Sequence, residues 1–300
     1  MIPQFKLSNG LSIPAQGLGT YTLHDEIMTN SIRAAYQAGC TLIDTAYAYE
    51  NEHYIGNSIK SLEKEGTLKR ENLFLQTKVG DRIDKKGRPI GYYFYNSPSC
   101  PCHDTKKVVF EQVENSLKQL QTDYLDLVMI HWPYYDVLND IWRCLEELYD
   151  EGLIKSIGVS NCKKRHIERI LKTANVVPMV NQINISPINT HVEDYEFCKQ
   201  NQIQLQAYSP LYPLRNETFK QTQKDLYQLA DKYGKTMSQI ILRWYFQKGI
   251  IPVPKSANPS RVKQNYDIYN FELTNEEVLS IDNANFNFQY LTESKFCPGY

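Results

Sequence analysis

The chain lacks the features that mark a membrane or nucleic-acid partner. It has no run of about 18 apolar residues, so we expect no transmembrane helix. Its first residues lack the apolar core of a secretory signal peptide. The 300 residues carry a formal net charge of -1, so the overall charge gives no argument for binding nucleic acid or an acidic membrane surface.

Two common nucleotide-binding signatures are also missing. No Gly-x-Gly-x-x-Gly follows an expected strand, which excludes the usual dinucleotide fingerprint. No Gly-x-x-x-x-Gly-Lys-Ser/Thr occurs, which argues against a nucleotide kinase or an ATPase. Internal repeats and low-complexity linkers are absent as well, so we expect a single domain over residues 1–300.

The seven cysteines give no disulfide framework, because they are an odd number scattered through a large chain. Reduced thiols in the cytoplasm are the simplest interpretation. Cys100, Cys102 and His103 could hold a metal, but their spacing is not that of a regular zinc site and a fourth ligand is missing. We therefore expect no metal. Four cysteines fall inside or beside expected elements: Cys40, Cys144, Cys162 and Cys198.

What the sequence does contain is an alternation of strand-like and helix-like segments. Seven apolar strand-like runs end on a polar side chain suited to chemistry, and helix-like stretches lie between most of them. This pattern predicts an α/β fold of the (β/α)8 TIM-barrel type, with an active site at the C-terminal ends of the strands. Strands are expected at 16–20, 40–44, 73–78, 125–130, 154–159, 179–183, 204–208 and 250–254.

Helical periodicity and capping signals predict the elements between these strands. A hairpin is expected at 6–13, around the turn Asn9-Gly10, where it could cap the bottom of the barrel. Two late helices begin near Pro259 and at the capping box Thr274-Asn275-Glu276-Glu277. The other helices are expected at 25–37, 51–62, 105–119, 138–150, 163–174, 192–200, 222–233 and 237–247.

An enlarged loop follows the third expected strand. Residues 80–104 include three glycines, the aromatic run from Tyr92 to Tyr95, and the Cys100 to His103 cluster. A loop of this length is uncommon, and when ordered it is usually functional. It would lie over the mouth of the barrel, although a surface insertion without a role fits equally well.

Four chemistry-bearing residues fall at or just after expected strand ends: Asp44, Tyr49, Lys78 and His131. A phenol is a poor acid at neutral pH, with an unperturbed pKa of about 10, but a nearby ammonium lowers that value. Lys78 could supply the ammonium and Asp44 could orient it. His131 could reach the same ligand. Such a set suits protonation of a carbonyl oxygen while its carbon accepts a nucleophile or hydride. Taken singly, each residue also has an ordinary structural interpretation, as an ion pair, a surface aromatic or a core histidine.

A second group of polar residues follows the last expected strand. Lys255, Ser256 and Arg261 combine two cations, a hydroxyl and the start of a helix. Barrels commonly bind phosphate after strands seven and eight, so this turn suits a phosphate-bearing ligand. A solvated basic turn is the alternative.

Seven motifs in order resemble the aldo-keto reductase family over nearly the whole chain. They are Gly17-Leu18-Gly19-Thr20, Ile43-Asp44-Thr45-Ala46 through Tyr49-Glu50-Asn51-Glu52, Ile130-His131-Trp132-Pro133, Ile157-Gly158-Val159-Ser160-Asn161, Val180-Asn181-Gln182-Ile183, Tyr208-Ser209-Pro210-Leu211 and Ile251-Pro252-Val253-Pro254-Lys255-Ser256. The resemblance implies reduction of aldehydes or ketones by NADP(H), preferred over NAD(H), without metal.

By the same resemblance, Tyr49 is the general acid, Lys78 and Asp44 tune it, and His131 orients the carbonyl. Tyr208 matches the aromatic residue that stacks on the nicotinamide ring. The resemblance also implies three residues at the nicotinamide carboxamide and four at the ribose 2′-phosphate and adenine. These are Ser160, Asn161 and Gln182, and then Lys255, Ser256, Arg261 and Asn265.

The chain departs from the family pattern around the substrate. Tyr21 stands where the family often has Trp, Asn184 and Ser186 replace the usual acidic residue and His, and Gln264 replaces an acidic residue near adenine. Tyr21, Tyr49 and Trp132 would form an aromatic pocket for hydrophobic or flat carbonyl compounds.

Two other functions remain open at this point. One is a lyase or aldolase in which Lys78 forms a Schiff base and the basic turn binds a sugar phosphate. The other is a cofactor-sensing subunit with vestigial chemistry, a role that the superfamily includes.

Overall fold

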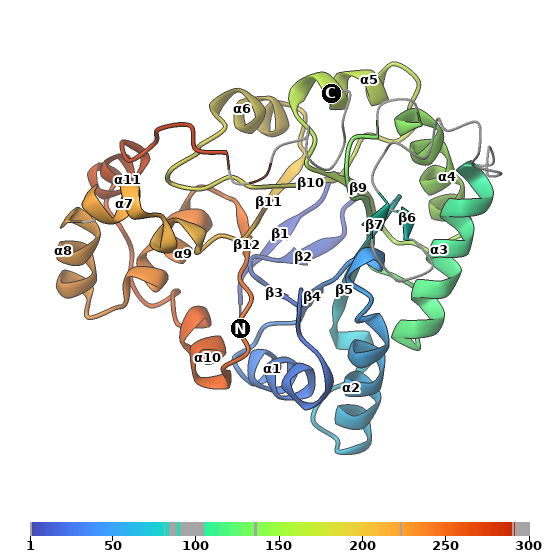
Figure 1. Ribbon diagram of the computed structural model, residues 1–300, viewed down its shortest axis with the longest axis horizontal. Coiled ribbons are helices and arrows are strands. Elements are labelled where there is room, and N and C mark those ends of the chain that lie inside the picture. The colour runs from blue at the N-terminus through green and yellow to red at the C-terminus, as the bar shows by residue number, and fades with distance from the viewer. Residues whose placement is uncertain are drawn as a thin grey trace.

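Eight parallel strands form the central sheet of the protein, as predicted. The computed structural model describes residues 2–80, 82–83, 89–90, 105–134, 137–222, 224–289 and 291. Neighbours in the sheet follow the order β3-β4-β5-β8-β9-β10-β11-β12 (Figure 1). These strands are β3 (Gly17–Gly19), β4 (Leu42–Asp44), β5 (Phe74–Val79), β8 (Leu127–Ile130), β9 (Ile157–Ser160), β10 (Val180–Ile183), β11 (Gln204–Tyr208) and β12 (Ile251–Val253).

The first and last strands meet, so the sheet curls into a nearly closed barrel. The Gly19 backbone N–H donates to the Pro254 carbonyl at 3.0 Å. A Cβ added at Gly19 would lie 3.1 Å from the Val253 carbonyl oxygen, so a larger residue would crowd this seam. Gly19, one of the two glycines that weaken the strand propensity of β3, therefore permits the close approach that closes the barrel.

A two-stranded hairpin precedes the barrel, as predicted. β1 (Gln4–Lys6) pairs antiparallel with β2 (Ser12–Pro14). The Asn9 side chain in its turn donates to the Lys155 carbonyl at 3.0 Å, just before β9 begins. The hairpin therefore covers the N-terminal ends of the barrel strands, and Figure 1 shows it over the centre of the ring. The opposite end, where the strands finish, is called the mouth below.

Helices surround the barrel, with at least one after each of its strands (Figure 1). The helix predicted over 222–233 is found as α8, and a short unpredicted helix, α7, precedes it. The helices are α1 (Asp25–Gln37), α2 (Glu52–Lys64), α3 (Thr105–Leu120), α4 (Leu138–Asp150), α5 (Lys164–Leu171), α6 (Val192–Gln200), α7 (Glu217–Thr222), α8 (Lys224–Tyr233), α9 (Met237–Gln247), α10 (Pro259–Tyr266) and α11 (Asn275–Asp282).

Local sequence explains where several helices begin and which face they bury. In α4, Ile141, Leu145 and Leu148 are buried along one face, as their helical spacing predicts. Thr274 and Glu277 form the predicted capping box at the start of α11. Apolar side chains fill most of the interior. Lys78 is an exception, because it is among the largest side chains that are fully buried.

Much of the predicted loop after β5 lies outside the described residues, including the aromatic run and the Cys100, Cys102 and His103 cluster. Within it, β6 (Arg82–Ile83) and β7 (Pro89–Ile90) form a small antiparallel pair. Four buried cysteines in the described part are free thiols: Cys40, Cys144, Cys162 and Cys198. Among the helices described, none has the length and apolar character needed to cross a membrane.

Candidate active site

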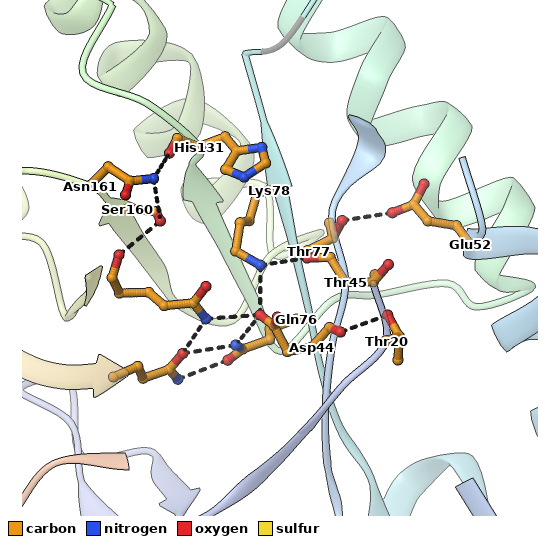
Figure 2. Close-up of polar contacts among 12 residues, drawn as sticks. Thr20, Asp44, Thr45, Glu52, Gln76, Thr77, Lys78, His131, Ser160 and Asn161 are labelled. Carbon is orange, nitrogen blue, oxygen red and sulfur yellow. Dashed lines mark hydrogen bonds and ion pairs between the residues drawn. The ribbon is translucent and has the colours of Figure 1, made fainter. Parts of the chain in front are cut away.

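A buried ion pair forms the base of the mouth. The Lys78 Nζ donates to Asp44 Oδ1 at 2.7 Å and to the Thr45 carbonyl at 2.8 Å. The two charged side chains are only 1% and 6% exposed. Asp44 ends β4 and Lys78 lies near the end of β5, so neighbouring parallel strands bring them together (Figure 2). Removing either partner would leave a buried charge uncompensated.

Side-chain amides surround the same carboxylate. Asp44 Oδ1 accepts from Gln76 Nε2 at 2.6 Å and from Gln182 Nε2 at 2.9 Å, in addition to Lys78. The side-chain oxygen Oε1 of Gln206 accepts from the Nε2 groups of both Gln76 and Gln182. Donors from two other strands, β5 and β10, therefore hold the carboxylate in place.

Tyr49 lies beside this pair, in a ring of aromatic side chains. It ends the 3₁₀ turn η1 (Tyr47–Tyr49), which Glu50 terminates in the left-handed conformation. The Lys78 Nζ is 5.3 Å from the centre of the Tyr49 ring. The His131 ring meets the Tyr49 ring edge-on, with 5.8 Å between the ring centroids. The centroid of the Tyr21 ring lies 4.9 Å from that of Tyr49. The structure thus brings together all four residues predicted as catalytic.

A second set of predicted residues lies at the ends of β9, β10 and β11. The Asn161 Nδ2 donates to the His131 carbonyl at 2.9 Å, and Asn161 Oδ1 accepts from the Tyr208 hydroxyl at 2.8 Å. Ser160 Oγ donates to the Gln182 carbonyl at 2.8 Å. Asn161 adopts a positive φ of 58°, a conformation that Asn tolerates better than most residues. Figure 2 shows Ser160 and Asn161 on the side of Lys78 where His131 lies.

A small cavity opens beside this second set. Trp132, Asn161 and Tyr208 line it, together with Asn184 and His191. Trp132 packs near the His131 ring and is mostly buried, whereas Tyr21 packs near the Tyr49 ring and is largely exposed. The two aromatic residues predicted for the substrate pocket therefore differ in burial.

The predicted phosphate turn lies at the start of α10, at the edge of the mouth. Lys255 and Arg261 are exposed, and Ser256 is half-buried. Asn258 caps the helix by accepting from the backbone N–H groups of Ser260 and Arg261. Asn265, the predicted adenine contact, is buried farther along α10, and its backbone carbonyl accepts from Gln16.

Sequence reasoning missed three buried polar residues around Lys78. Gln76 and Gln206 bond to the Asp44 network, and Glu52 lies on the other side of β5. The Glu52 carboxylate accepts from the Thr77 hydroxyl at 2.6 Å (Figure 2). It also accepts from the Ser116 hydroxyl at 2.9 Å. Burial raises the pKa of Glu52 to about 7. A signal for Gln76 existed, since alternation places it on the same strand face as Lys78.

A nearly closed parallel barrel whose mouth holds a tyrosine, a histidine and a buried lysine–aspartate pair is suited to acid catalysis on a polar ligand. Comparison with known proteins agrees. The sequence model of the Aldo/keto reductase family matches residues 15–285. The chain therefore belongs to the aldo/keto reductase family, and it is an oxidoreductase that acts on carbonyl groups.

Individual relatives extend this result. The chain is 40% identical over 284 residues to the glyoxal reductase of Bacillus subtilis (strain 168), covering 93% of this chain and 92% of that protein. It is 35% identical over 275 residues to a methylglyoxal reductase of Escherichia coli (strain K12), covering 91% and 90%. A Bombyx mori aldo-keto reductase solved in complex with NADP matches with a TM-score of 0.82 and 30% identity, covering 98% of this chain and 96% of that one.

Proposed function

We propose that this protein reduces small 2-oxoaldehydes of the glyoxal and methylglyoxal type to hydroxyaldehydes or hydroxyketones, with NADPH in preference to NADH. The observation that carries the proposal is the buried Lys78–Asp44 pair beneath Tyr49 and beside His131. The two reductases named above support the substrate class, because their identity to this chain extends over nine-tenths of its length.

In this proposal Tyr49 donates the proton that the carbonyl oxygen needs as its carbon is reduced. The ammonium of Lys78 stabilises the phenolate that Tyr49 becomes. Asp44 fixes the direction of Lys78 and compensates its buried charge, since a buried ammonium without a partner would be strongly disfavoured. His131, edge-on to Tyr49, donates or accepts at the same oxygen and orients the carbonyl group.

The residues around the mouth have the chemistry that a nicotinamide cofactor requires. NADPH, when bound, supplies the hydride that reduces the carbonyl carbon. Both N–H groups of the Gln182 side-chain amide donate, one to Asp44 and one to Gln206. The side-chain oxygen Oε1 of Gln182 is therefore the atom that would accept from the nicotinamide carboxamide. Ser160 and Asn161 lie beside it, and Tyr208 offers a ring face for stacking.

The preference for NADPH rests on the turn at the start of α10. Lys255 and Arg261 are exposed and cationic, and they flank the first turn of a helix. Charge-assisted bonds from such groups suit a 2′-phosphate. Ser256 adds a hydroxyl, and Asn265 lies one helical turn after Arg261, where it would contact adenine. NADH lacks the phosphate and would gain nothing from these cations.

The substrate proposal fits the two aromatic side chains near Tyr49 and His131. Trp132 is buried near His131, and the exposed Tyr21 packs near the Tyr49 ring. A flat dicarbonyl compound can lie between such rings while one oxygen reaches Tyr49 and His131.

The Schiff-base alternative is disfavoured by the surroundings of Lys78. A nucleophilic amine must be neutral and accessible. The Lys78 nitrogen instead donates to Asp44 and to the Thr45 carbonyl, and its side chain is only 1% exposed. A vestigial sensing role is also disfavoured, because the residues that acid catalysis needs are all present and lie close together.

We also propose that residues 1–300 form one barrel domain that works in the cytoplasm. The family match covers residues 15–285, and the hairpin before it bonds to the base of the barrel. The four buried free thiols are compatible with a reducing compartment.

The decisive experiment compares Tyr49→Phe with Tyr47→Phe, a matched change in the same 3₁₀ turn. Turnover of glyoxal and methylglyoxal is followed by loss of cofactor absorbance with NADPH and with NADH. We expect Tyr49→Phe to lower kcat by about 10²- to 10⁴-fold, the usual contribution of a general acid, while NADPH still binds. Tyr47→Phe should retain activity. If Tyr49→Phe keeps most of the wild-type rate, Tyr49 is not the proton donor.

A further inference from the structure

Four buried side chains from four strands meet at the centre of the barrel, below the mouth. They are Asp44 from β4, Gln76 from β5, Gln182 from β10 and Gln206 from β11, and each of these residues is buried. Because β5 and β11 are not neighbours in the sheet, the contact between Gln76 and Gln206 crosses the barrel interior.

Gln206 bonds to both of the other amides. Its Oε1 accepts from Gln76 Nε2 and from Gln182 Nε2, each at 2.8 Å. Its Nε2 donates to Gln76 Oε1 at 2.9 Å, so two hydrogen bonds join the side-chain amides of Gln206 and Gln76. Buried amides satisfied in this way are fixed in direction, since reversing one of them would place two acceptors face to face.

This arrangement determines which end of each amide faces Asp44. Oε1 of Gln206 accepts one hydrogen from each Nε2 group, so the second hydrogen of each points at Asp44 Oδ1. The Nε2 to Oδ1 distance is 2.6 Å for Gln76 and 2.9 Å for Gln182. Without Gln206, only the carboxylate itself would select the Nε2 end of each amide. The two amides would then be held less firmly, and their bonds to the charge that holds Lys78 in place would weaken.

We propose that Gln206 is a positioning residue that couples the nicotinamide side of the site to the proton-donating side. The inference rests on the proposed function, because it takes Gln182 as the carboxamide contact and Lys78 as the partner of Tyr49. Gln206 itself touches neither cofactor nor substrate. It acts through Gln182 on one side, and through Gln76 and Asp44 on the other.

The first test replaces Gln206 with methionine, which fills a similar volume without the hydrogen bonds. We expect the Kd of NADPH, measured by protein fluorescence, to rise about tenfold, and kcat for methylglyoxal to fall about tenfold, the effect of losing one or two net hydrogen bonds at each side. Gln204→Met is the control: Gln204 is two residues earlier on β11, and its Nε2 bonds to Gly249 instead of this network. It should leave both quantities close to wild type.

A second variant keeps the test decisive if Gln206→Met folds poorly. In Gln206→Glu, a protonated carboxyl group can reproduce the amide pattern, with its carbonyl accepting from both Nε2 groups and its O–H donating to Gln76 Oε1. The ionised form cannot donate. Among the described residues, the hydrogen-bond network links this position to the charged groups Asp44 and Lys78, and Glu52 lies across β5 from them. Relative to wild type at the same pH, we expect Gln206→Glu to be nearly normal at pH 6 and about tenfold slower at pH 8.5.

The outcomes separate this inference from the proposed function. If the wild-type protein neither binds NADPH nor reduces dicarbonyl compounds, the proposed function fails. If the wild type does both but Gln206→Met leaves Kd and kcat unchanged, the coupling role of Gln206 is wrong. A Gln206→Glu variant whose activity relative to wild type is the same at both pH values would overturn it as well.

Discussion

The two halves of the proposed site are built in opposite ways. The catalytic half is buried: Lys78, Asp44 and the glutamines around them are enclosed and hydrogen-bonded before any ligand arrives. The phosphate half is exposed: Lys255 and Arg261 project from the turn before α10 and from its first turn. In a buried site each polar group interacts strongly and is costly to leave unpaired, whereas solvent and salt weaken the interactions of exposed cations.

The two halves should therefore respond differently to substitution. The buried half is organised by folding, so its substitutions should change stability and catalysis together. In the proposed function the exposed half would gain order on binding a phosphate, so its substitutions should change affinity and leave the fold intact. Three substitutions test this contrast, and they are ordered by the size of the expected effect.

The largest effect is expected for Lys78→Met, which keeps much of the side-chain volume and removes the charge. Asp44 would then be buried without its cation, so we expect a stability loss of about 3–5 kcal/mol in urea denaturation. The kcat for methylglyoxal should fall at least about 10²-fold, because Tyr49 loses its ammonium partner. Lys60→Met, which removes an exposed pair with Glu63, should cost less than about 1 kcal/mol.

A second variant checks whether the loss comes from the uncompensated charge. Combining Lys78→Met with Asp44→Asn removes both charges, so it should regain part of the lost stability without regaining activity. A single Lys78→Met variant as stable as Lys60→Met would show that the buried half is not organised by this ion pair.

An intermediate effect is expected for Glu52→Gln. Burial raises the pKa of Glu52 from its ordinary 4.5 to about 7. Between pH 4.5 and pH 7, Glu52 is therefore protonated in the folded protein but ionised in the unfolded chain. This group therefore lowers stability as pH rises from 4.5 to 7, by up to about 3 kcal/mol. Glu52→Gln should remove that dependence. Its stability relative to wild type should increase over the same interval and then level off.

Urea denaturation at pH 5, 6, 7 and 8 measures this effect. The control is Glu71→Gln, because the Glu71 side chain is 73% exposed and should give no such trend. A constant difference between Glu52→Gln and wild type across these pH values would mean that Glu52 does not titrate in this range in the folded protein.

The smallest effect is expected for Arg261→Ala. Losing the charge-assisted bonds of one arginine should raise the Kd of NADPH about tenfold or more at low salt, and less at high salt. The Kd of NADH and the urea midpoint should stay close to wild type, since Arg261 is exposed. Lys263→Ala on the same helix is the control. Equal losses of NADPH and NADH affinity would contradict a 2′-phosphate role.

Sequence pattern alone was enough for the barrel and for the position of most site residues. Strands that end on Asp44, Lys78 and His131 were predicted from apolar runs, and the parallel sheet brings their ends to one mouth. The glutamine pair could not be predicted in the same way. Alternation places Gln76 on the same strand face as Lys78. No local pattern indicates that Gln206 hydrogen-bonds to Gln76 at 2.8 Å, because its strand, β11, does not neighbour β5.

The sequence by itself determined the alternation of elements, the residues at the strand ends and the basic turn, because side-chain periodicity and turn chemistry act over a few residues. Only the tertiary structure decided which polar groups are buried against one another. Closure of the sheet at Gly19 brings opposite strands together. Burial then makes the ion pair of Lys78, the raised pKa of Glu52 and the direction of the glutamine amides depend on neighbours far away in the chain.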